Sequence, residues 1–272
     1  MPQTTFLFWN LNRKPLLNLV AELAGSRRAD VVILAECADE PRSILQVLNA
    51  NGDGGFRYPR SVCERVRVFT KFSGQFLVPE FESERISIRR LSLPARSKVL
   101  LAMAHLPSKL HCSDASQFFE CTELARDIAL IEDRAGHGRT ILVGDLNMNP
   151  FESGLVGAGG LNAVMARHVA WRGQRTVQGR SYRYFYNPMW NFFGDMSNGP
   201  PGTYYYEKSE HVTYFWNIFD QVLVRPELSH GLTRDDIEIV RAVGTRSLVK
   251  PDGTPDGGGC SDHLPVIFRL EF

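Results

Sequence analysis

The sequence lacks several features that would place it in a specialised class of protein. No apolar run approaches the roughly 20 residues that a membrane-spanning helix needs. The N-terminal residues do not combine a basic segment with a long apolar core, so we expect no secretory signal. Repeats, low-complexity tracts and internal linkers are also missing. With 272 residues, 43% of them hydrophobic, the chain can bury a sizeable core, and we expect a single domain over residues 1–272.

Cysteine and net charge are scarce as well. The five scattered cysteines form no C-x-x-C pair, which favours a reduced, cytoplasmic protein over a disulfide framework. Lysine and arginine total 31 against 30 acidic residues, so the net charge is only +1. No global field therefore attracts the chain to nucleic acid or to a membrane, and any such attraction must be local.

The most informative stretch that is present is residues 141–150, ILVGDLNMNP. Its apolar run predicts a buried strand, which stops at Gly144. Asp145 and Asn147 then stand at the end of a rigid sheet, where they suit a site for phosphate and a hard cation. The same residue types also form turns, so by itself the stretch favours no more than an Asx-rich turn.

Four further apolar runs present a polar group at one end. These are residues 6–12 with Asn10, residues 31–36 with Glu36, residues 99–105 with His105, and residues 260–268 with Asp262 and His263. A lone histidine in such a place is more often structural than catalytic. Five strands that all deliver Asn, Glu, Asp or His at one end are hard to explain by stability alone.

The ordered motifs WNLN, LAE, AHLPS, GDLNMNP, FDQVLV and SDHLP resemble the endonuclease/exonuclease/phosphatase superfamily. They run from residue 9 to residue 265, and GDLN followed by SDH is specific although each motif is weak alone. The superfamily includes deoxyribonucleases, abasic-site endonucleases, sphingomyelinases, inositol polyphosphate phosphatases and deadenylases. The resemblance implies a four-layer α/β/β/α sandwich of two mixed β-sheets flanked by helices, with the site at one end.

Hydrophobic periodicity predicts a layered α/β architecture without reference to any family. We expect helices at residues 15–24, 41–48 and 113–134. Beyond the runs already named, we expect strands at residues 66–69, 75–78, 86–88 and 98–104.

Phosphodiester cleavage needs in-line attack by water and positive charge on the phosphoryl oxygens, which a hard cation held by carboxylates supplies. The resemblance implies that Glu36 is a metal ligand and that Asn10 assists through its oxygen or a metal-bound water. Asp262 is either another metal-site carboxylate or a carboxylate beside the neighbouring histidine. We expect Mg²⁺ as the cofactor, with Mn²⁺ as the alternative.

The resemblance also implies catalytic roles. His263 would contact the scissile phosphate or manage a proton, oriented by Asp220. Asp145 would orient or deprotonate the attacking water, Asn147 would bind a phosphate oxygen, and His105 would lie near the leaving group. An acid at the head of an apolar strand, as Asp220 is, should be costly unless paired, which supports its pairing with an imidazole. Which of these groups acts as base or acid stays open.

Residues 153–194 contain no Asp or Glu but have arginines interleaved with aromatic residues. Arginines grip phosphates and aromatic faces stack on bases, so the segment indicates nucleic-acid binding by Arg167, Arg172, Arg175, Arg180 and Arg183. The alternative is a satellite core with arginine stems packed over it. A second aromatic cluster, residues 203–206 and 214–216, is expected to form strands or a wall near Asp220, chiefly by packing.

We therefore predict a Mg²⁺-dependent phosphodiesterase, and more specifically a nuclease that acts on DNA in preference to RNA. We expect no membrane partner. The alternatives are an RNA nuclease, a hydrolase of small or lipid phosphates, and an inactive nucleic-acid-binding module. The sequence shows no exposed apolar hairpin or anchoring helix, which disfavours a lipid substrate. The intact Glu36, Asp145, Asn147, Asp220 and His263 disfavour an inactive module. The oligomeric state stays open.

Overall fold

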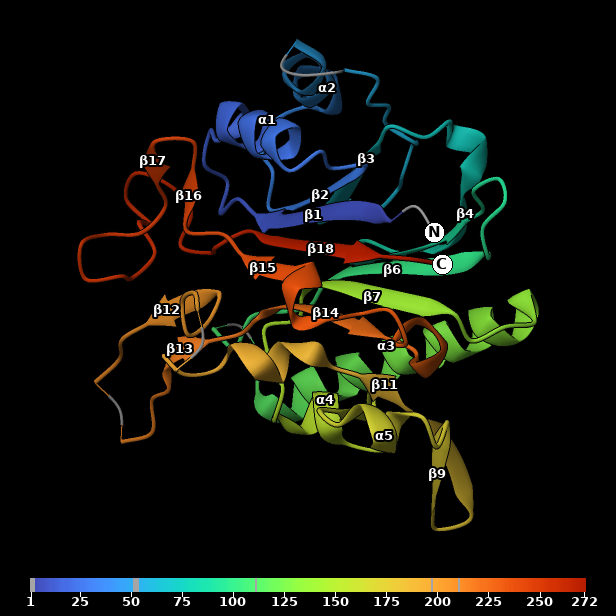
Figure 1. Cartoon of the computed structure of the whole chain (residues 1–272). Coiled ribbons are helices and arrows are strands. Elements are labelled where there is room, and N and C mark those ends of the chain that lie inside the picture. Colours follow the sequence, from blue (N-terminus) through green and yellow to red (C-terminus); the bar gives the residue numbers. More distant parts are fainter. Residues whose placement is uncertain (1–2, 51–53, 111, 197, 210) are drawn as a thin grey trace.

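The computed structural model describes residues 3–50, 54–110, 112–196, 198–209 and 211–272. Two mixed β-sheets pack face to face, and helices cover the outer side of each sheet (Figure 1). This arrangement confirms the predicted four-layer α/β/β/α sandwich. Within the described ranges, no helix is long and apolar enough to cross a membrane.

The first sheet has five strands, in which β1 runs parallel to β2 and the other neighbours are antiparallel. In spatial order they are β15 (Ile237–Ile239), β18 (Val266–Leu270), β1 (Thr4–Asn10), β2 (Val31–Ala35) and β3 (Val66–Thr70). The outer face of this sheet is covered by α1 (Leu17–Ser26) and α2 (Pro41–Ala50) (Figure 1).

The second sheet has seven strands, with the central pair β6 and β7 parallel. In spatial order they are β4 (Leu77–Glu82), β5 (Ile86–Leu91), β6 (Val99–His105), β7 (Thr140–Asp145), β14 (Asp220–Val224), β11 (Phe185–Tyr186) and β8 (Ala163–Val164). Its outer face carries the long helix α3 (Asp114–Ala135) and the short helices α4 (Ser153–Val156) and α5 (Arg167–Ala170) (Figure 1).

Neighbouring residues of β6 face different layers of the sandwich. Leu101 and Met103 belong to the core between the two sheets, whereas Leu100 and Ala102 belong to the core beneath α3. Because successive side chains of a strand point to opposite faces, a strand that is covered on both faces must be apolar throughout. The uninterrupted apolar run at residues 99–104 follows from this double burial.

Three small hairpins extend from the sandwich. They are β9 (Gln174–Val177) with β10 (Arg180–Arg183), β12 (Tyr204–Tyr206) with β13 (Phe215–Asn217), and β16 (Ala242–Val243) with β17 (Arg246–Ser247). In Figure 1 the β9–β10 hairpin lies at the opposite end of the molecule from β12 and β13.

The predicted elements are present with shifted boundaries. α1 begins two residues later than the predicted start and continues past Gly25, which a helix tolerates at a modest cost. Residues 75–76 were predicted to begin a strand, and this is wrong. They lie in a short 3₁₀ helix, Gly74–Phe76, because the amide of Phe76 bonds back to the carbonyl of Ser73 at 2.9 Å.

Strand register brings the predicted site residues to one end of the sandwich. Asp145, the last residue of β7, lies opposite His105 of β6 on one side and opposite Asp220 of β14 on the other. In the first sheet, Asn10 at the end of β1 pairs with Ala35, so that Glu36 follows directly. The five residues come from five strands of two sheets or the turns that follow them.

The approach of β6 to β7 depends on Gly144, since a Cβ at this position would lie only 1.9 Å from the carbonyl oxygen of Ala104. We predict that Gly144→Ala lowers the free energy of unfolding by about 2 kcal/mol or more, because the two strands must separate. Urea denaturation measures the change. The control is Gly25→Ala, at an exposed helical position with nothing within 4 Å, which should stabilise by up to about 1 kcal/mol. Equal unfolding midpoints for the two variants would contradict the close approach.

Candidate active site

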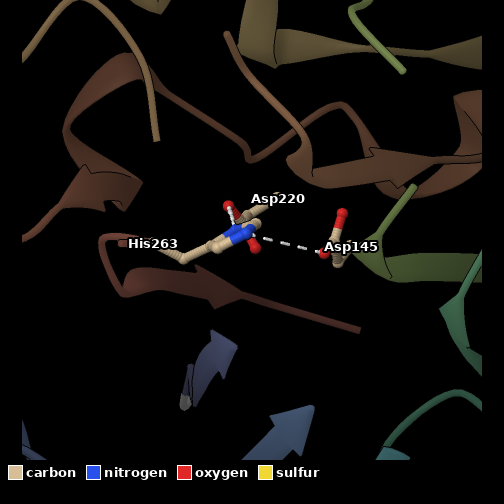
Figure 2. Close-up of side chains that lie close together, drawn as sticks. All are labelled: Asp145, Asp220 and His263. Atoms are coloured by element: carbon tan, nitrogen blue, oxygen red, sulfur yellow. Dashed lines mark hydrogen bonds and ion pairs between the residues drawn. The ribbon is translucent and has the colours of Figure 1, made fainter. Parts of the chain in front are cut away.

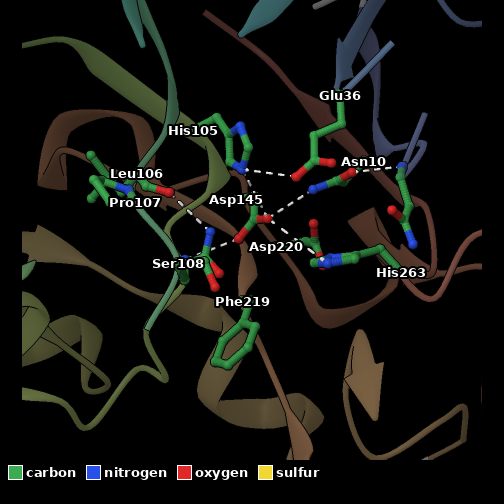
Figure 3. Close-up of polar contacts among 12 residues, drawn as sticks. Asn10, Glu36, His105, Leu106, Pro107, Ser108, Asp145, Phe219, Asp220 and His263 are labelled. Atoms are coloured by element: carbon green, nitrogen blue, oxygen red, sulfur yellow. Dashed lines mark hydrogen bonds and ion pairs between the residues drawn. The ribbon is translucent and has the colours of Figure 1, made fainter. Parts of the chain in front are cut away.

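A cleft of about 860 Å³ opens at the end of the sandwich where these strands finish. Its lining includes seven of the eight residues predicted for catalysis or metal binding: Asn10, Glu36, His105, Asp145, Asn147, Asp262 and His263. Figure 3 shows Glu36, His105 and His263 around Asp145. The eighth, Asp220, is fully buried behind His263. The structure thus brings together the whole predicted set.

Asp145 is the centre of the site. Its Oδ1 accepts a hydrogen bond from the backbone amide of Asn147 at 2.9 Å, and its Oδ2 accepts one from Nδ2 of Asn10 at 2.9 Å. The Nε2 atoms of His105 and His263 lie 3.6 Å and 3.9 Å from the same Oδ2. A single carboxylate, 1% exposed, is therefore oriented by both sheets and faces two imidazoles.

His263 and Asp220 form a buried pair in which Nδ1 lies 2.8 Å from Oδ2 (Figure 2). Burial opposes the charged form of His263, but the carboxylates of Asp220 and Asp145 outweigh it and raise the histidine pKa to about 10. Burial raises the pKa of Asp220 to about 6. At neutral pH the pair is therefore an imidazolium held by a carboxylate.

His105 has the opposite electrostatic character. Its Nε2 lies 3.4 Å from Oε1 of Glu36 as well as near Asp145. Burial nevertheless lowers its pKa, against the pull of these two carboxylates and with the help of the nearby Arg85 guanidinium. The site therefore holds one charged and one neutral imidazole at neutral pH.

Two site residues adopt left-handed backbone conformations. Glu36, which directly follows β2, has φ of 45°, and Asn147, two residues after the end of β7, has φ of 50°. The backbone of Asn147 is fixed by its own Nδ2, which donates to the carbonyl of Leu106 at 2.9 Å, and by Gln117, whose Nε2 donates to its carbonyl at 3.1 Å. Such conformations persist only where the surroundings enforce them.

Several supporting residues were not assigned a role from the sequence. Oγ1 of Thr203 accepts the backbone amide of Asp220 at 3.2 Å, and Nε1 of Trp9 donates to the carbonyl of His263 at 2.9 Å. Ser261 donates from Oγ to the carbonyl of Asn10 at 2.7 Å and accepts the amide of His263 at 3.1 Å. Trp9 lies within the WNLN motif and Ser261 within the SDH motif, and this position was the one feature of the sequence that could have indicated their supporting role.

Tyr204 is part of the site, although its cluster was expected chiefly to pack. Its ring centroid lies 4.7 Å from that of His263 and 5.2 Å from that of Phe219. Burial and then the carboxylate of Asp262 raise the pKa of its phenol to about 12, so the hydroxyl stays protonated. The prediction that residues 203–206 and 214–216 form strands near Asp220 is confirmed by β12 and β13.

The donor set fits a hard divalent cation. Glu36 and Asn10 line one cleft, and Mg²⁺ or Mn²⁺ prefers carboxylate and amide oxygen ligands. Oδ1 of Asn10 accepts a hydrogen bond from the backbone amide of Asn12 at 2.9 Å and keeps one lone pair for an ion or its water. Glu36 keeps 29% of its side chain exposed, so its carboxylate is open to an ion. The atoms of Asp145, Asp220 and His263 also lie within 4.8 Å of one another, but two of these groups are already bonded together.

Asp262 precedes His263 and lines the same cleft as Glu36 and Asn10. Its buried Oδ1 has no hydrogen-bond partner among the described residues. Its charge contributes to raising the pKa of His263. Asp262 thus acts electrostatically on the histidine, and its other expected place, in the metal site, stays a prediction.

The five predicted nucleic-acid-binding arginines do not reach the cleft. None of them, all lying in the described part of the chain, is among its lining residues. Arg183 instead pairs with Glu132 at 3.1 Å and Asp133 at 2.6 Å beside a second cavity of about 760 Å³. Arg167 lies over the ring of Tyr186, 5.2 Å from its centroid. For these two the packing alternative fits better, and Arg172, Arg175 and Arg180 are exposed at or near the remote hairpin.

Comparison with known proteins agrees with this geometry. A model of the endonuclease/exonuclease/phosphatase family matches residues 7–263. The chain belongs to this family. Members of the family are metal-dependent hydrolases, so the protein is an enzyme of that type, and the predicted resemblance is confirmed. No curated protein matches the sequence significantly.

Solved structures share the fold at low sequence identity. D. rerio TDP2 complexed with single strand DNA product is 17% identical, with 100% of both chains covered and a TM-score of 0.55. The 3′ phosphatase NExo from Neisseria, bound to product DNA hairpin, is 15% identical, with 99% of this chain and 100% of that chain covered and a TM-score of 0.57. The human Nocturnin catalytic domain with bound sulfate anion is 15% identical, with 100% and 95% covered and a TM-score of 0.55.

The charge on His263 depends on Asp220, and this dependence can be measured. We predict that Asp220→Asn moves the alkaline limb of the pH–rate profile from near pH 10 to lower pH. A histidine charge is present below its pKa and lost as pH rises through it, and a neutral amide cannot hold that pKa up. The limb is read from kcat/KM on a small phosphodiester, or from an NMR titration of the ring.

Asp262→Asn is the matched control for this prediction, because Asp262 is the weakest of the contributing carboxylates and should give a smaller shift. An alkaline limb that stays in place in Asp220→Asn would show that Asp220 does not hold the charge on His263.

Proposed function

We propose that this enzyme is a Mg²⁺-dependent phosphodiesterase that cleaves nucleic acid, with DNA favoured over RNA. The observation that carries the proposal is the placement of Asp145 within 4 Å of two imidazoles, one of them paired with the buried Asp220, in an open cleft. In-line displacement at phosphorus needs a positioned base for water and a positive donor for the phosphoryl oxygens. Asp145 and His263 supply these two groups.

The chain's own residues can hold the phosphate. The imidazolium of His263 donates from Nε2, which points into the cleft because Nδ1 is held by Asp220. Asn147 uses one amide hydrogen for Leu106 and has a second to offer to a phosphate oxygen. The ring of Tyr204 packs against that of His263, and its hydroxyl is protonated.

Asp145 is the group best placed to activate water. Both its oxygens are oriented by neutral donors, and the charged His263 cannot accept a proton. The water oxygen bonds to phosphorus as its proton passes to Asp145, and the bond from phosphorus to the leaving oxygen breaks. The products are a phosphate monoester and a hydroxyl group, which takes its proton from the medium.

Glu36 and Asn10 are the residues that would hold the cation. Bound there, Mg²⁺ would place positive charge on the phosphoryl oxygens. Mn²⁺ has the same ligand preference and is the alternative cofactor.

Nucleic acid is favoured as the substrate by two considerations. The DNA-bound relatives named above share the fold over nearly their whole length. The same cleft also carries arginines free of carboxylate partners among the described residues, Arg13 and Arg85, which suit neighbouring phosphates. The first consideration favours DNA, whereas the arginines would serve RNA equally well.

Conversion of supercoiled plasmid to nicked or linear DNA tests the proposal. We predict cutting that requires Mg²⁺, stops with EDTA, and falls by about 100-fold or more in His263→Ala and in Asp145→Asn. Circular dichroism of both variants checks that the fold is kept. Near wild-type cutting by either variant would remove that residue from the catalytic set. If the wild-type enzyme cuts no DNA, RNA and small phosphate esters follow with the same variants.

The metal assignment is tested by titration. We predict that Glu36→Gln raises the Mg²⁺ concentration for half-maximal activity at least about tenfold, because a carboxylate ligand is replaced by a neutral amide. Isothermal titration calorimetry of Mg²⁺ and Mn²⁺ gives a readout that does not depend on turnover. Glu40→Gln, at an exposed position outside the cleft, should leave both curves unchanged. Superimposable titrations for Glu36→Gln and wild type would take Glu36 out of the metal site.

A further inference from the structure

A row of aromatic rings leads outward from the catalytic histidine. Tyr204 lies against His263, and Tyr206 follows with its ring centroid 6.4 Å from that of Tyr204 and an interplanar angle of 15°. Both tyrosines belong to β12 and line the cleft. Tyr206 is 39% exposed, so the outer end of the row is open to solvent.

A second exposed ring lines the same cleft. Tyr214, which precedes β13, is 55% exposed, yet Phe151 holds it edge-on with a centroid distance of 5.0 Å. Phe151 itself packs against Trp190 and Phe193. Phe151 thus holds the ring of Tyr214 in place, while part of the ring stays exposed to the cleft. Because the ring is already ordered, little conformational freedom is lost when a planar ligand stacks on it.

Positive charge lies on other parts of the cleft. Of its lining cations, Arg65 pairs with Glu84 at 2.9 Å, and Lys109 pairs with both Asp114 and Glu152. The exposed Arg13 has no hydrogen-bond or ion-pair partner for its guanidinium among the described residues. The guanidinium of Arg85 donates, within the described ranges, only to the carbonyl of His105, at 3.5 Å. Two guanidinium groups therefore remain for phosphates that flank the one at His263.

We propose that the cleft takes a single, unpaired nucleic-acid strand, with nucleobases stacked on Tyr206 and Tyr214 beside the scissile phosphate. This inference rests on the proposed nuclease function and names the form of nucleic acid that the site prefers. Aromatic side chains stack on bases whose faces are free, and a base inside a duplex has both faces covered by its neighbours. The enzyme then favours single strands, frayed ends and flaps over blunt duplex.

The β12–β13 hairpin exposes apolar side chains, although no exposed apolar hairpin was expected, and this raises the question of a lipid substrate. Val212 is 71% exposed and Phe215 41% exposed on this hairpin. The turn between its strands, however, carries the exposed charged residues Glu207 and Lys208. A tip that inserted into a membrane would have to bury these charges, which is costly, so an unpaired nucleic-acid strand fits the surface better.

Fluorescence of 2-aminopurine tests the inference independently of turnover. A single-stranded oligonucleotide with 2-aminopurine near its end is titrated with the inactive Asp145→Asn enzyme in Mg²⁺. We expect the fluorescence to be quenched on binding, as stacking requires. Adding Tyr206→Ala or Tyr214→Ala should reduce the quenching and raise Kd by about 5- to 100-fold for each ring. Tyr206→Phe and Tyr214→Phe keep the ring and should behave like the parent.

Two controls separate stacking from other roles. A strand of the same length with abasic sugars has the phosphates but no bases, so the alanine variants should bind it like the parent. The double variant Arg175→Ala/Arg180→Ala removes charge from the remote hairpin and should leave Kd for the 2-aminopurine strand unchanged. An equal loss of affinity for the abasic strand in the tyrosine variants would mean that the rings serve only the structure, and would overturn the inference.

Binding to other ligands, a blunt duplex and lipid vesicles, provides two further tests. Affinity for a blunt duplex equal to or above that for the single strand would overturn the inference. Binding to phosphatidylcholine/phosphatidylserine vesicles that is lost in Tyr214→Ala would also overturn the inference, because Tyr214 would then face a membrane. If the wild-type enzyme hydrolyses no nucleic acid, the proposed function fails, whereas the 2-aminopurine titration still decides whether the cleft stacks unpaired bases.

Discussion

The hydrogen bond from Asn10 to Asp145 is the contact on which the site depends, because it joins the strand ends of two separate sheets. Each sheet alone could fix only half of the functional groups. The first brings Asn10 beside Glu36, and the second aligns Asp145 with its histidine and aspartate neighbours by strand register. Packing of the two apolar inner faces sets the distance between the halves, so catalytic geometry is a property of the core as much as of the cleft.

Neighbouring charges give the two histidines different charge states. Burial disfavours the charged form of both, but Nδ1 of His263 lies 2.8 Å from Asp220, whereas Nε2 of His105 lies 3.4 Å from Glu36 and 3.6 Å from Asp145. The aromatic face of Tyr204 covers His263 and limits water around the charged ring. Two groups of one chemical type therefore differ in charge at one pH, and the buried Asp220 is the largest contributor to the charge on His263.

The sequence was sufficient to predict a layered α/β architecture from its apolar runs and the four layers from its family resemblance. It also indicated which polar side chains share one end of the sandwich, because they stand at the ends of buried apolar strands. It was not sufficient for the substrate surface. The arginine-rich segment at residues 167–183 has the composition of a nucleic-acid site, but composition does not tell which end of a sheet a hairpin occupies. Arg13 and Arg85 are inconspicuous in the sequence, and reach the cleft only because the turns after β1 and before β5 lie at its rim. The contact of Tyr204 with His263 could likewise not be predicted from the sequence, because it depends on tertiary packing.

The pairing of β1 with β18, from Thr4–Leu270 to Phe8–Val266, has a consequence for the timing of activity during synthesis. Asn10, Glu36, His105 and Asp145 leave the ribosome well before His263, which finds its place only when β18 docks on β1 and Trp9 bonds to it. Pairings over such long sequence separations form late. A nascent chain that ends before residue 263 therefore holds most of the cleft residues without this imidazole, and the proposed hydrolysis would begin only after β18 has been synthesised and has docked.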